Sequence, residues 1–438
     1  MKRSRLRPKF TGGTKWRRIR LMATPRPPVH LLTNGKRHAR PRRTFIEMFA
    51  GVGLVRFGLE QAGWECIFAN DIDEEKAHTY EANFSPDSIF IDDIHNLTAK
   101  HIPAYPLLAT ASFPCQDLSL AGARAGLRGS RSGTFWGFIS LLRKLQTDGR
   151  RPHLIMLENV PGLVTSHRGK DFEQVLASLN ALGYLCNAAL VDARWFVPQS
   201  RLRLFIFGVN AGSLGEPNTL YDSEWAKVFT PHLSSAVESS ALHPPLLSKA
   251  IRGNRHIRWF PLPPIDRPAN AVPALESIIE PDTDIPQDWW YEPEKVKRLL
   301  GRMWESHRKK VLDATRGTKR RVFTGYWRTR NGSPKFEVRF DSVAGCLRTP
   351  VGGSSKQSVI LAGRGKIKAR LLTPREYARL QGVPDSFMLP EDRNAGYMGM
   401  GDAVAVPAIK WVGEQILNPI AEKMKRVEVE AALSLVPA

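Results

Sequence analysis

The sequence predicts an α/β protein with a doubly wound, mostly parallel sheet and a second, smaller, irregular domain. Between residues 43 and 209, short apolar runs alternate with helical patterns, which is typical of a parallel sheet covered by helices on both faces. The alternation stops near Val209, and residues 210–340 are rich in Pro, Trp and Arg with few periodic segments. Helical patterns return at Thr373 and at about 404–415.

The alternation can be divided into expected elements. Strands are expected at 44–50, 64–70, 88–91, 107–113, 153–159, 184–191 and 203–209, and helices at 54–62, 74–83, 134–146 and 171–182. The organisation that follows is a basic, disordered arm at 1–42, an α/β domain at 43–209, a second domain at 210–343, and a return to the first domain at 344–438. In such sheets, ligands bind outside the carboxyl ends of the strands.

Composition excludes several classes of protein. The 438 residues are 42% hydrophobic and 24% charged, with neither an apolar run of transmembrane length nor a secretory signal. The four cysteines, Cys66, Cys115, Cys186 and Cys346, are far apart and form no C-x-x-C pair, so the sequence predicts no metal site and no disulfide framework. The expected location is the cytoplasm.

Positive charge is concentrated at the N-terminus. The net charge is +22, and residues 1–43 hold 15 Lys or Arg and no Asp or Glu. A basic arm of this kind indicates contact with nucleic acid phosphates. The alternatives are an arm that only aids solubility, or an upstream start codon, since Met22 could also begin the chain.

The ends of the first three expected strands carry groups suited to a nucleotide-like ligand. The first strand leads into Phe49, Gly51 and Gly53, a turn that lets backbone approach a ligand but that also suits a nicotinamide enzyme or a purely structural turn. Asp71, about 20 residues on, can accept hydrogen bonds from ribose hydroxyls, or can cap a helix as Asp73 can. Asp92 or Asp93 takes the third position.

The next two strand ends carry Cys115 and Glu158. Pro114 ends strand pairing, so Cys115 projects at the carboxyl edge of the sheet, near helix N-termini that lower a thiol pKa. Glu158 emerges from an apolar run, and partial desolvation would let it hold a proton near neutral pH. Taken separately, Cys115 could equally be core packing and Glu158 a surface charge.

Six strings carry a family resemblance. FAGVG, FPCQDLSLAG, ENV, QSRLR, LTPREYARLQGVPDSF and GDAVAVP occur in the order found in the DNA (cytosine-5) methyltransferases. The chain resembles that family, in its bacterial restriction–modification form, over roughly 43–209 and 341–417. The dissimilar middle lies where the family carries its target-recognition domain, and the flanking parts correspond to the S-adenosylmethionine-binding catalytic domain.

The resemblance implies a mechanism. Cys115 would add to C6 of a cytosine flipped out of the duplex, and C5 would take the methyl group of S-adenosylmethionine. Glu158 would hold the proton at N3. Arg201 and Arg203 match the family's arginine pair, and Arg203 would contact O2 of the base and brace the acid. The alternative for the two arginines is a solubilising sheet edge.

The resemblance also assigns a cofactor site and a DNA surface. The cofactor residues would be Phe49, Gly51, Gly53, Asp71, Ile72, Asp93 and Pro114. Asp402 departs from the family's usual asparagine, and a carboxylate cannot donate as an amide does. DNA contacts would come from the loop at 119–133 and from the basic, aromatic segment at 307–330, represented by Gln116, Ser119, Arg124, Arg128, Arg320, Arg321, Arg328 and Arg330.

The expected partner is double-stranded DNA, which would also place the protein at the nucleoid. The protein is expected to be a monomer that does not associate with a membrane. A cognate restriction endonuclease is expected in the same system. A tRNA cytosine methyltransferase shares these motifs, but the long basic middle domain favours duplex DNA. A catalytically silent DNA-binding protein is the alternative from another class, and the intact Cys115, Glu158 and arginine pair argue against it. A nicotinamide oxidoreductase would leave Cys115, Glu158 and the basic arm without a role.

Overall fold

The computed structural model describes most of the chain after the basic arm. The described residues are 43–103, 105–114, 133–214, 241–260, 262, 265, 267–269, 271–349 and 356–424. The basic arm at 1–42, for which disorder was expected, lies outside them.

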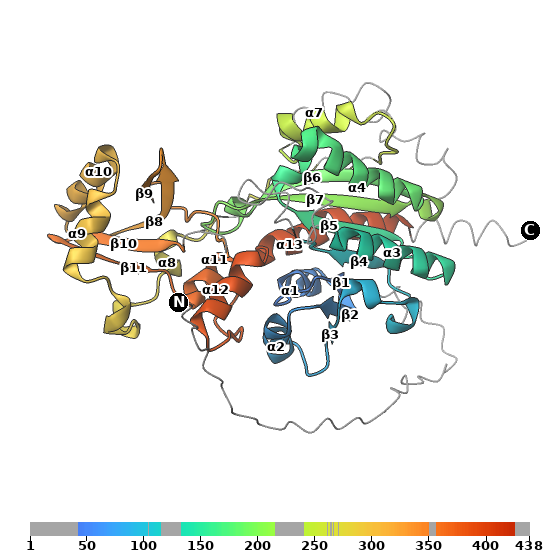
Figure 1. Cartoon of the computed structure of the whole chain (residues 1–438), viewed down its shortest axis with the longest axis horizontal. Coiled ribbons are helices and arrows are strands. Elements are labelled where there is room, and N and C mark those ends of the chain that lie inside the picture. Colours follow the sequence, from blue (N-terminus) through green and yellow to red (C-terminus); the bar gives the residue numbers. More distant parts are fainter. Residues whose placement is uncertain are drawn as a thin grey trace, which may run out of the picture. The chain divides into compact units, whose positions relative to one another are not determined.

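A seven-stranded sheet carries the first part of the described chain (Figure 1), with strand order β3-β2-β1-β4-β5-β7-β6. The first five strands are parallel, whereas β7 is antiparallel to both β5 and β6. The strands are β1 (Thr44–Met48), β2 (Glu65–Asp71), β3 (Phe90–Ile91), β4 (Leu108–Ala111), β5 (Leu154–Asn159), β6 (Tyr184–Asp192) and β7 (Leu202–Asn210). The expected doubly wound, mostly parallel sheet is therefore confirmed.

Helices cover both faces of this sheet, because side chains alternate between faces along each strand. Ile46 and Met48 of β1 share a buried cluster with α3 (Thr134–Thr147) and α4 (Lys170–Ala181). Phe45 points the other way, into a cluster with α1 (Leu54–Gln61) and α13 (Val406–Val412). The helix α2 (Glu74–Asn83) packs beside β2. The first four helices lie within a residue of their expected bounds, while α13 ends at Val412 and continues as a π-helix, Gly413–Leu417.

The expected irregular region contains much of a regular antiparallel sheet. Its strands are β8 (Arg321–Arg330), β9 (Ser333–Arg339), β10 (Ser358–Gly363) and β11 (Lys366–Leu371), in the order β11-β10-β8-β9. Asn331 and Gly332 have φ of 48° and 74°, the left-handed pair of a tight hairpin between β8 and β9. This Asn-Gly pair is a sequence signal for a hairpin that was not among the predicted elements.

The remaining helices divide between the two sheets. They are α7 (Pro245–Gly253), α8 (Leu275–Ile278), α9 (Pro293–Gly301), α10 (Glu305–Thr315), α11 (Pro374–Leu380) and α12 (Arg393–Asp402). Leu247 and Ile251 of α7 pack in the same cluster as α4, against the large sheet. The small sheet takes two strands from before residue 344 and two from after it. The domain boundaries expected from the sequence stay a prediction.

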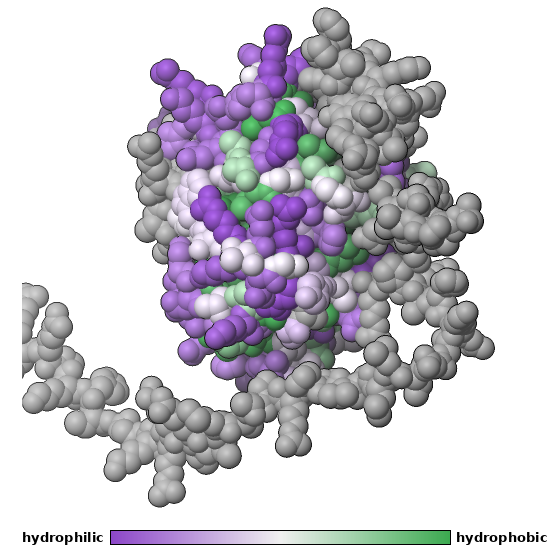
Figure 2. All heavy atoms as spheres, turned by 90° about the vertical axis from the view of Figure 1, so that its right-hand side faces the viewer, coloured by the Kyte–Doolittle hydropathy of each residue, from purple (hydrophilic) through white to green (hydrophobic). Residues whose placement is uncertain are grey.

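The surface around the large sheet is mostly polar on the face that Figure 2 shows, with hydrophobic residues in small groups between hydrophilic ones. This distribution follows from the amphipathic helices, which turn their apolar stripes to the sheet. Among the described residues, no helix is both long enough and apolar enough to cross a membrane.

Candidate active site

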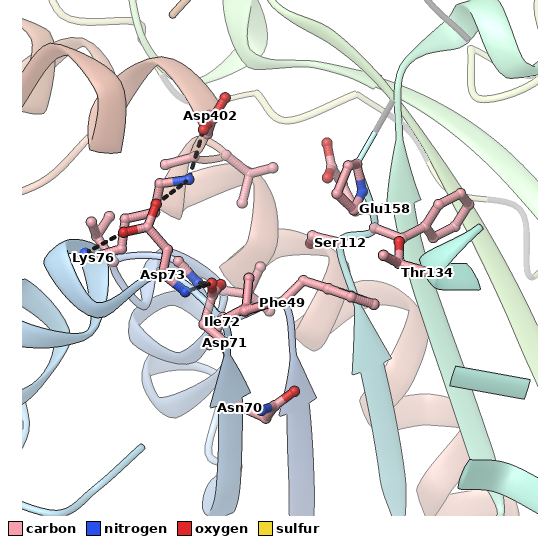
Figure 3. Close-up of a pocket in the computed structure, with 18 of the residues that line it drawn as sticks. Phe49, Asn70, Asp71, Ile72, Asp73, Lys76, Ser112, Thr134, Glu158 and Asp402 are labelled. Carbon is pink, nitrogen blue, oxygen red and sulfur yellow. Dashed lines mark hydrogen bonds and ion pairs between the residues drawn. The ribbon is translucent and has the colours of Figure 1, made fainter. Parts of the chain in front are cut away.

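A cavity of about 580 Å³ opens at the carboxyl ends of β1, β2, β4 and β5. Its volume is in the range of small-molecule and cofactor sites. It brings together eight of the predicted site residues, which are Phe49, Gly51, Asp71, Ile72, Asp93, Pro114, Glu158 and Arg203. Figure 3 shows how several of these side chains converge.

The glycine turn after β1 is tied to the end of β2. The backbone N–H of Gly51 donates to Oδ2 of Asp71 at 2.7 Å, and that of Asp73 donates to Oδ1 of Asp71 at 2.9 Å. A carboxylate has about four acceptor positions, so both oxygens of Asp71 keep the capacity to accept a ligand hydroxyl. Asp73 itself caps α2.

Two residues of the turn have unusual backbones. Phe49 adopts φ of 57°, a left-handed conformation that is rare for a bulky residue and is typical of ligand-binding turns. Gly53 has φ of 84°, and a Cβ there would lie 2.3 Å from the Phe84 ring. Gly53 is therefore required by packing against α2, and it is not part of the cavity lining.

Next to the turn, the cavity offers an apolar surface and carboxylates. Ile72 is 66% exposed and lines the cavity, where its side chain could pack against a flat ring. Asp93 accepts from the backbone and ring nitrogens of His95, and these hydrogen bonds lower the pKa of its carboxyl. Among the described residues, His, Cys, Asp and Glu side chains form no group of three or more that could hold a metal ion.

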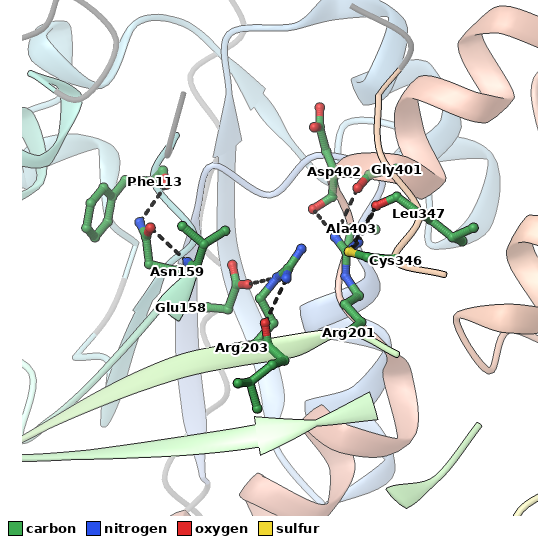
Figure 4. Close-up of polar contacts among 12 residues, drawn as sticks. Phe113, Glu158, Asn159, Arg201, Arg203, Cys346, Leu347, Gly401, Asp402 and Ala403 are labelled. Carbon is green, nitrogen blue, oxygen red and sulfur yellow. Dashed lines mark hydrogen bonds and ion pairs between the residues drawn. The ribbon is translucent and has the colours of Figure 1, made fainter. Parts of the chain in front are cut away.

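At the other end of the cavity, Glu158 and Arg203 form an ion pair. Nε of Arg203 lies 2.9 Å from Oε1 of Glu158 (Figure 4), and Glu158 is 8% exposed. Burial raises the pKa of Glu158, although Arg203 and Arg201 oppose that shift. The neighbouring Asn159 donates to the carbonyl of Phe113 at 3.1 Å, which ties β5 to the end of β4. The result is a carboxyl group able to hold a proton, braced by a guanidinium.

Arg201 has a different position. It is 1% exposed and is not part of the cavity lining. Its guanidinium donates to four backbone carbonyls, those of Leu347, Gly401, Asp402 and Ala403. Arg201 thus fastens the end of α12, which lines the cavity, to the start of β7 (Figure 4).

Asp402 and Lys76 meet across the cavity wall. Nζ of Lys76 lies 2.8 Å from Oδ2 of Asp402 and 3.6 Å from Oδ2 of Asp73 (Figure 3). The departure of Asp402 from the family pattern is visible in the sequence, whereas Lys76 was not a predicted site residue. No local pattern joins two residues that are 326 positions apart.

Five predicted site residues lie outside the described residues, and these are Cys115, Gln116, Ser119, Arg124 and Arg128. Pro114, the residue before Cys115, lines the cavity.

The predicted arginines of the middle region lie on β8 or, for Arg320, directly before it, and none is part of the cavity lining. Arg328 and Arg330 of β8 approach Glu337 of β9 at 3.8 Å and 2.6 Å. Arg320 pairs with Asp282 at 2.7 Å, and Arg321 is exposed at the start of β8. Glu337 was not among the predicted site residues, and its place opposite Tyr326 follows from the hairpin register.

Comparison with known proteins identifies the family. The family model for C-5 cytosine-specific DNA methylase matches residues 43–418. The chain belongs to this family. The methylase is 28% identical to the type II methyltransferase M.DsaV of Dactylococcopsis salina, over 89% of this chain and 92% of that protein. It is also 28% identical to the type II methyltransferase M.HpaII of Haemophilus parainfluenzae, over 87% and 91%.

Solved structures share the fold of this methylase. The Entamoeba histolytica methyltransferase EhMeth matches with a TM-score of 0.55 and 14% identity, over 87% of this chain and 99% of that chain. A mutant of Spodoptera frugiperda DNMT2 matches with a TM-score of 0.52 and 17% identity, over the same shares. The family makes the chain a C-5 cytosine-specific DNA methylase, and its relatives M.DsaV and M.HpaII are type II methyltransferases.

Proposed function

We propose that this methylase transfers a methyl group from S-adenosylmethionine to C5 of a cytosine that is flipped out of a specific duplex sequence. The observation that carries the proposal is the Glu158–Arg203 pair at 2.9 Å, in the wall of the cavity that Asp71, Ile72 and Asp93 also line. One cavity therefore offers groups for a cytosine ring beside groups for an adenosine moiety. The names of the type II relatives support a role beside a cognate restriction endonuclease.

The chemistry of the cavity fits S-adenosylmethionine. Ile72 offers an exposed apolar surface for adenine, and Asp93 offers an acceptor for its amino group. Asp71 keeps acceptor positions for the ribose hydroxyls. At Gly51, which has φ of 55°, a Cβ would meet nothing within 4 Å, so the backbone itself is open to the ligand. When bound, the cofactor would supply the methyl group.

The protein side chains would activate the base. The thiolate of Cys115 would add to C6 of cytosine, which makes C5 nucleophilic toward the methyl carbon. Glu158 would keep a proton at N3, and Arg203 would donate to O2 while holding the acid in place. After methyl transfer, loss of the C5 proton would expel the thiolate and restore the 5,6 double bond.

The first test follows covalent capture. Full-length protein is incubated with labelled S-adenosylmethionine and DNA, and separately with duplexes that contain 5-fluorocytosine. We expect label in 5-methylcytosine and a stalled adduct on the fluorinated duplex, because loss of the C5 substituent is blocked there. Cys115→Ser should abolish both products. Cys66→Ser serves as the matched control, since Cys66 lies on β2 outside the cavity lining.

Absence of labelled cytosine in every DNA tested would contradict the proposal. If label enters tRNA and not duplex DNA, the substrate is an RNA and the proposed DNA substrate is wrong. Bisulfite sequencing of host DNA before and after expression would give the recognition sequence.

A further inference from the structure

An ion pair closes one wall of the cofactor cavity. Lys76 lies in the first turn of α2, and Asp402 is the last residue of α12. Both line the cavity, and their charged atoms are 2.8 Å apart. The pair is partly sheltered, since the side chains are 21% and 45% exposed.

The position of Asp402 is electrostatically unfavourable for a carboxylate. The C-terminal end of a helix carries partial negative charge, which disfavours an anion there. The described cavity lining also holds more acids than bases. The acids are Asp71, Asp73, Asp92, Asp93, Glu158 and Asp402, and the bases are Lys76 and Arg203. Because Arg203 pairs with Glu158, Lys76 is the cation that faces the remaining carboxylates.

Lys76 responds to these neighbours. Burial would lower its pKa, but the carboxylates of Asp402, Asp71 and Asp73 outweigh burial and raise it. Lys76 therefore stays charged. The backbone around Asp402 is also held by Arg201, which donates hydrogen bonds to the carbonyls of Gly401, Asp402 and Ala403. The end of α12 is held between two cations, Arg201 from β7 and Lys76 from α2.

We propose that Lys76 and Asp402 form an ionic clasp, and that tight binding of the cofactor requires Lys76 to neutralise Asp402. The inference rests on the proposed use of S-adenosylmethionine. Without Lys76, the negative charge of Asp402 at the C-terminal end of α12 would have lost its partner, and this part of the cavity wall would be released from α2. Lys76 is thus a positioning residue, and it compensates for the aspartate that this chain has at residue 402.

The two partners should respond unequally to substitution. Asp402→Asn leaves Lys76 beside Asp73, 3.6 Å away, so a charged partner remains. Lys76→Gln leaves the carboxylate of Asp402 in an acidic wall without its cation. The loss of cofactor affinity on substitution of Lys76 should therefore depend on whether residue 402 is charged.

The test measures equilibrium binding of S-adenosylmethionine by the full-length protein without DNA, so that turnover does not contribute. We expect Lys76→Gln to raise the dissociation constant about tenfold, and Asp402→Asn to raise it less than about threefold. The double variant should bind like Asp402→Asn alone. Lys76→Arg should bind like the wild type, because it keeps the charge. Thermal unfolding of each variant without cofactor reports any general loss of stability.

The matched control is Lys410→Gln. Lys410 of α13 pairs with Glu414 at 3.8 Å and is not part of the cavity lining, so this variant loses the same charge elsewhere. Its cofactor affinity should be unchanged. The clasp is overturned if Lys76→Gln binds cofactor like the wild type, or if Asp402→Asn does not relieve its defect. A wild-type protein that binds no S-adenosylmethionine would instead contradict the proposed cofactor, and the inference with it.

Discussion

Burial and a neighbouring positive charge have opposite effects on the pKa of Glu158. Glu158 ends an apolar strand, so desolvation favours the neutral carboxylic acid, while Arg203 at 2.9 Å favours the carboxylate. Burial is the larger effect, and the pKa of Glu158 lies above its usual value. A carboxyl group in this state can hold a proton and can take up a proton again after a charge has formed nearby.

The pH dependence of methylation should report this group. Since the pKa of Glu158 is raised, its proton is present at low pH and is lost as the pH rises through that pKa. We expect the single-turnover rate to fall on the alkaline side for this reason. Glu158→Gln should reduce the rate by about 100-fold and should remove that alkaline decline.

The measurement is the single-turnover rate of methyl transfer as a function of pH. Glu422→Gln is the control, because Glu422 is exposed and pairs with Arg43 away from the cavity. An alkaline decline of the same size in the wild type and in Glu158→Gln would assign it to another group.

At the scale of elements, the end of α12 depends on the start of β7. Arg201 is buried there and donates to four carbonyls, whereas Arg203, two residues on, reaches the cavity and Glu158. Adjacent side chains on a strand point to opposite faces, and residues two apart share one. Here the two arginines still differ in role, because Arg201 donates its hydrogen bonds to carbonyls of the later segments at 347 and 401–403.

Substitution by lysine should separate the two arginines. Lysine keeps the charge but lacks the planar fork that spans several acceptors. Arg201→Lys should lower the free energy of unfolding by about 2–4 kcal/mol, because it leaves buried carbonyls without donors. It should also weaken cofactor binding. Arg203→Lys should mainly lower kcat. Urea unfolding and steady-state kinetics measure the two effects, and equal losses of stability in both variants would contradict the division.

At the scale of the whole molecule, the chain runs through the large sheet, builds β8 and β9 of the small sheet, then builds β10 and β11, and returns to the large sheet at α13. Between β9 and β10, Ala344 forms a bridge with Gln199, so this segment passes beside the residues that lead into β7. The exposed arginines of the β8–β9 hairpin belong to the small sheet, and the reactive cavity belongs to the large one. We expect both parts to contact DNA at once.

Removing hairpin arginines should weaken DNA binding without changing cofactor binding. Arg328→Ala combined with Arg330→Ala should raise the dissociation constant for duplex DNA. If the two contact phosphates, the slope of log affinity against log salt should fall by about one for each lost contact. If they contact bases, discrimination between sequences should fall instead.

Lys249→Ala is the control for the hairpin, because Lys249 is exposed on α7, which packs against the large sheet. Fluorescence anisotropy at several salt concentrations makes the measurement. Unchanged affinity and unchanged discrimination in the double variant would remove the hairpin from the DNA surface.

The local patterns of the sequence predicted most of the large sheet. Its strands are short apolar runs, and α1 to α4 have helical periodicity with bounds close to those observed. The same strand ends predicted the cavity residues, because the carboxyl ends of parallel strands meet at one edge. The small sheet was not predicted, since β10 pairs with β8 across residue 344, and pairing register is not a local property.

The sequence by itself determined the fold class, the family motifs and several of the residues that line the cavity. Only the tertiary structure decided that Arg201 fastens α12, that Glu158 is buried against Arg203, and that Lys76 forms an ion pair with Asp402. The physical reason is distance along the chain. Apolar periodicity acts over a few residues, whereas ion pairs and shared carbonyls form between segments that meet only when the sheet is complete.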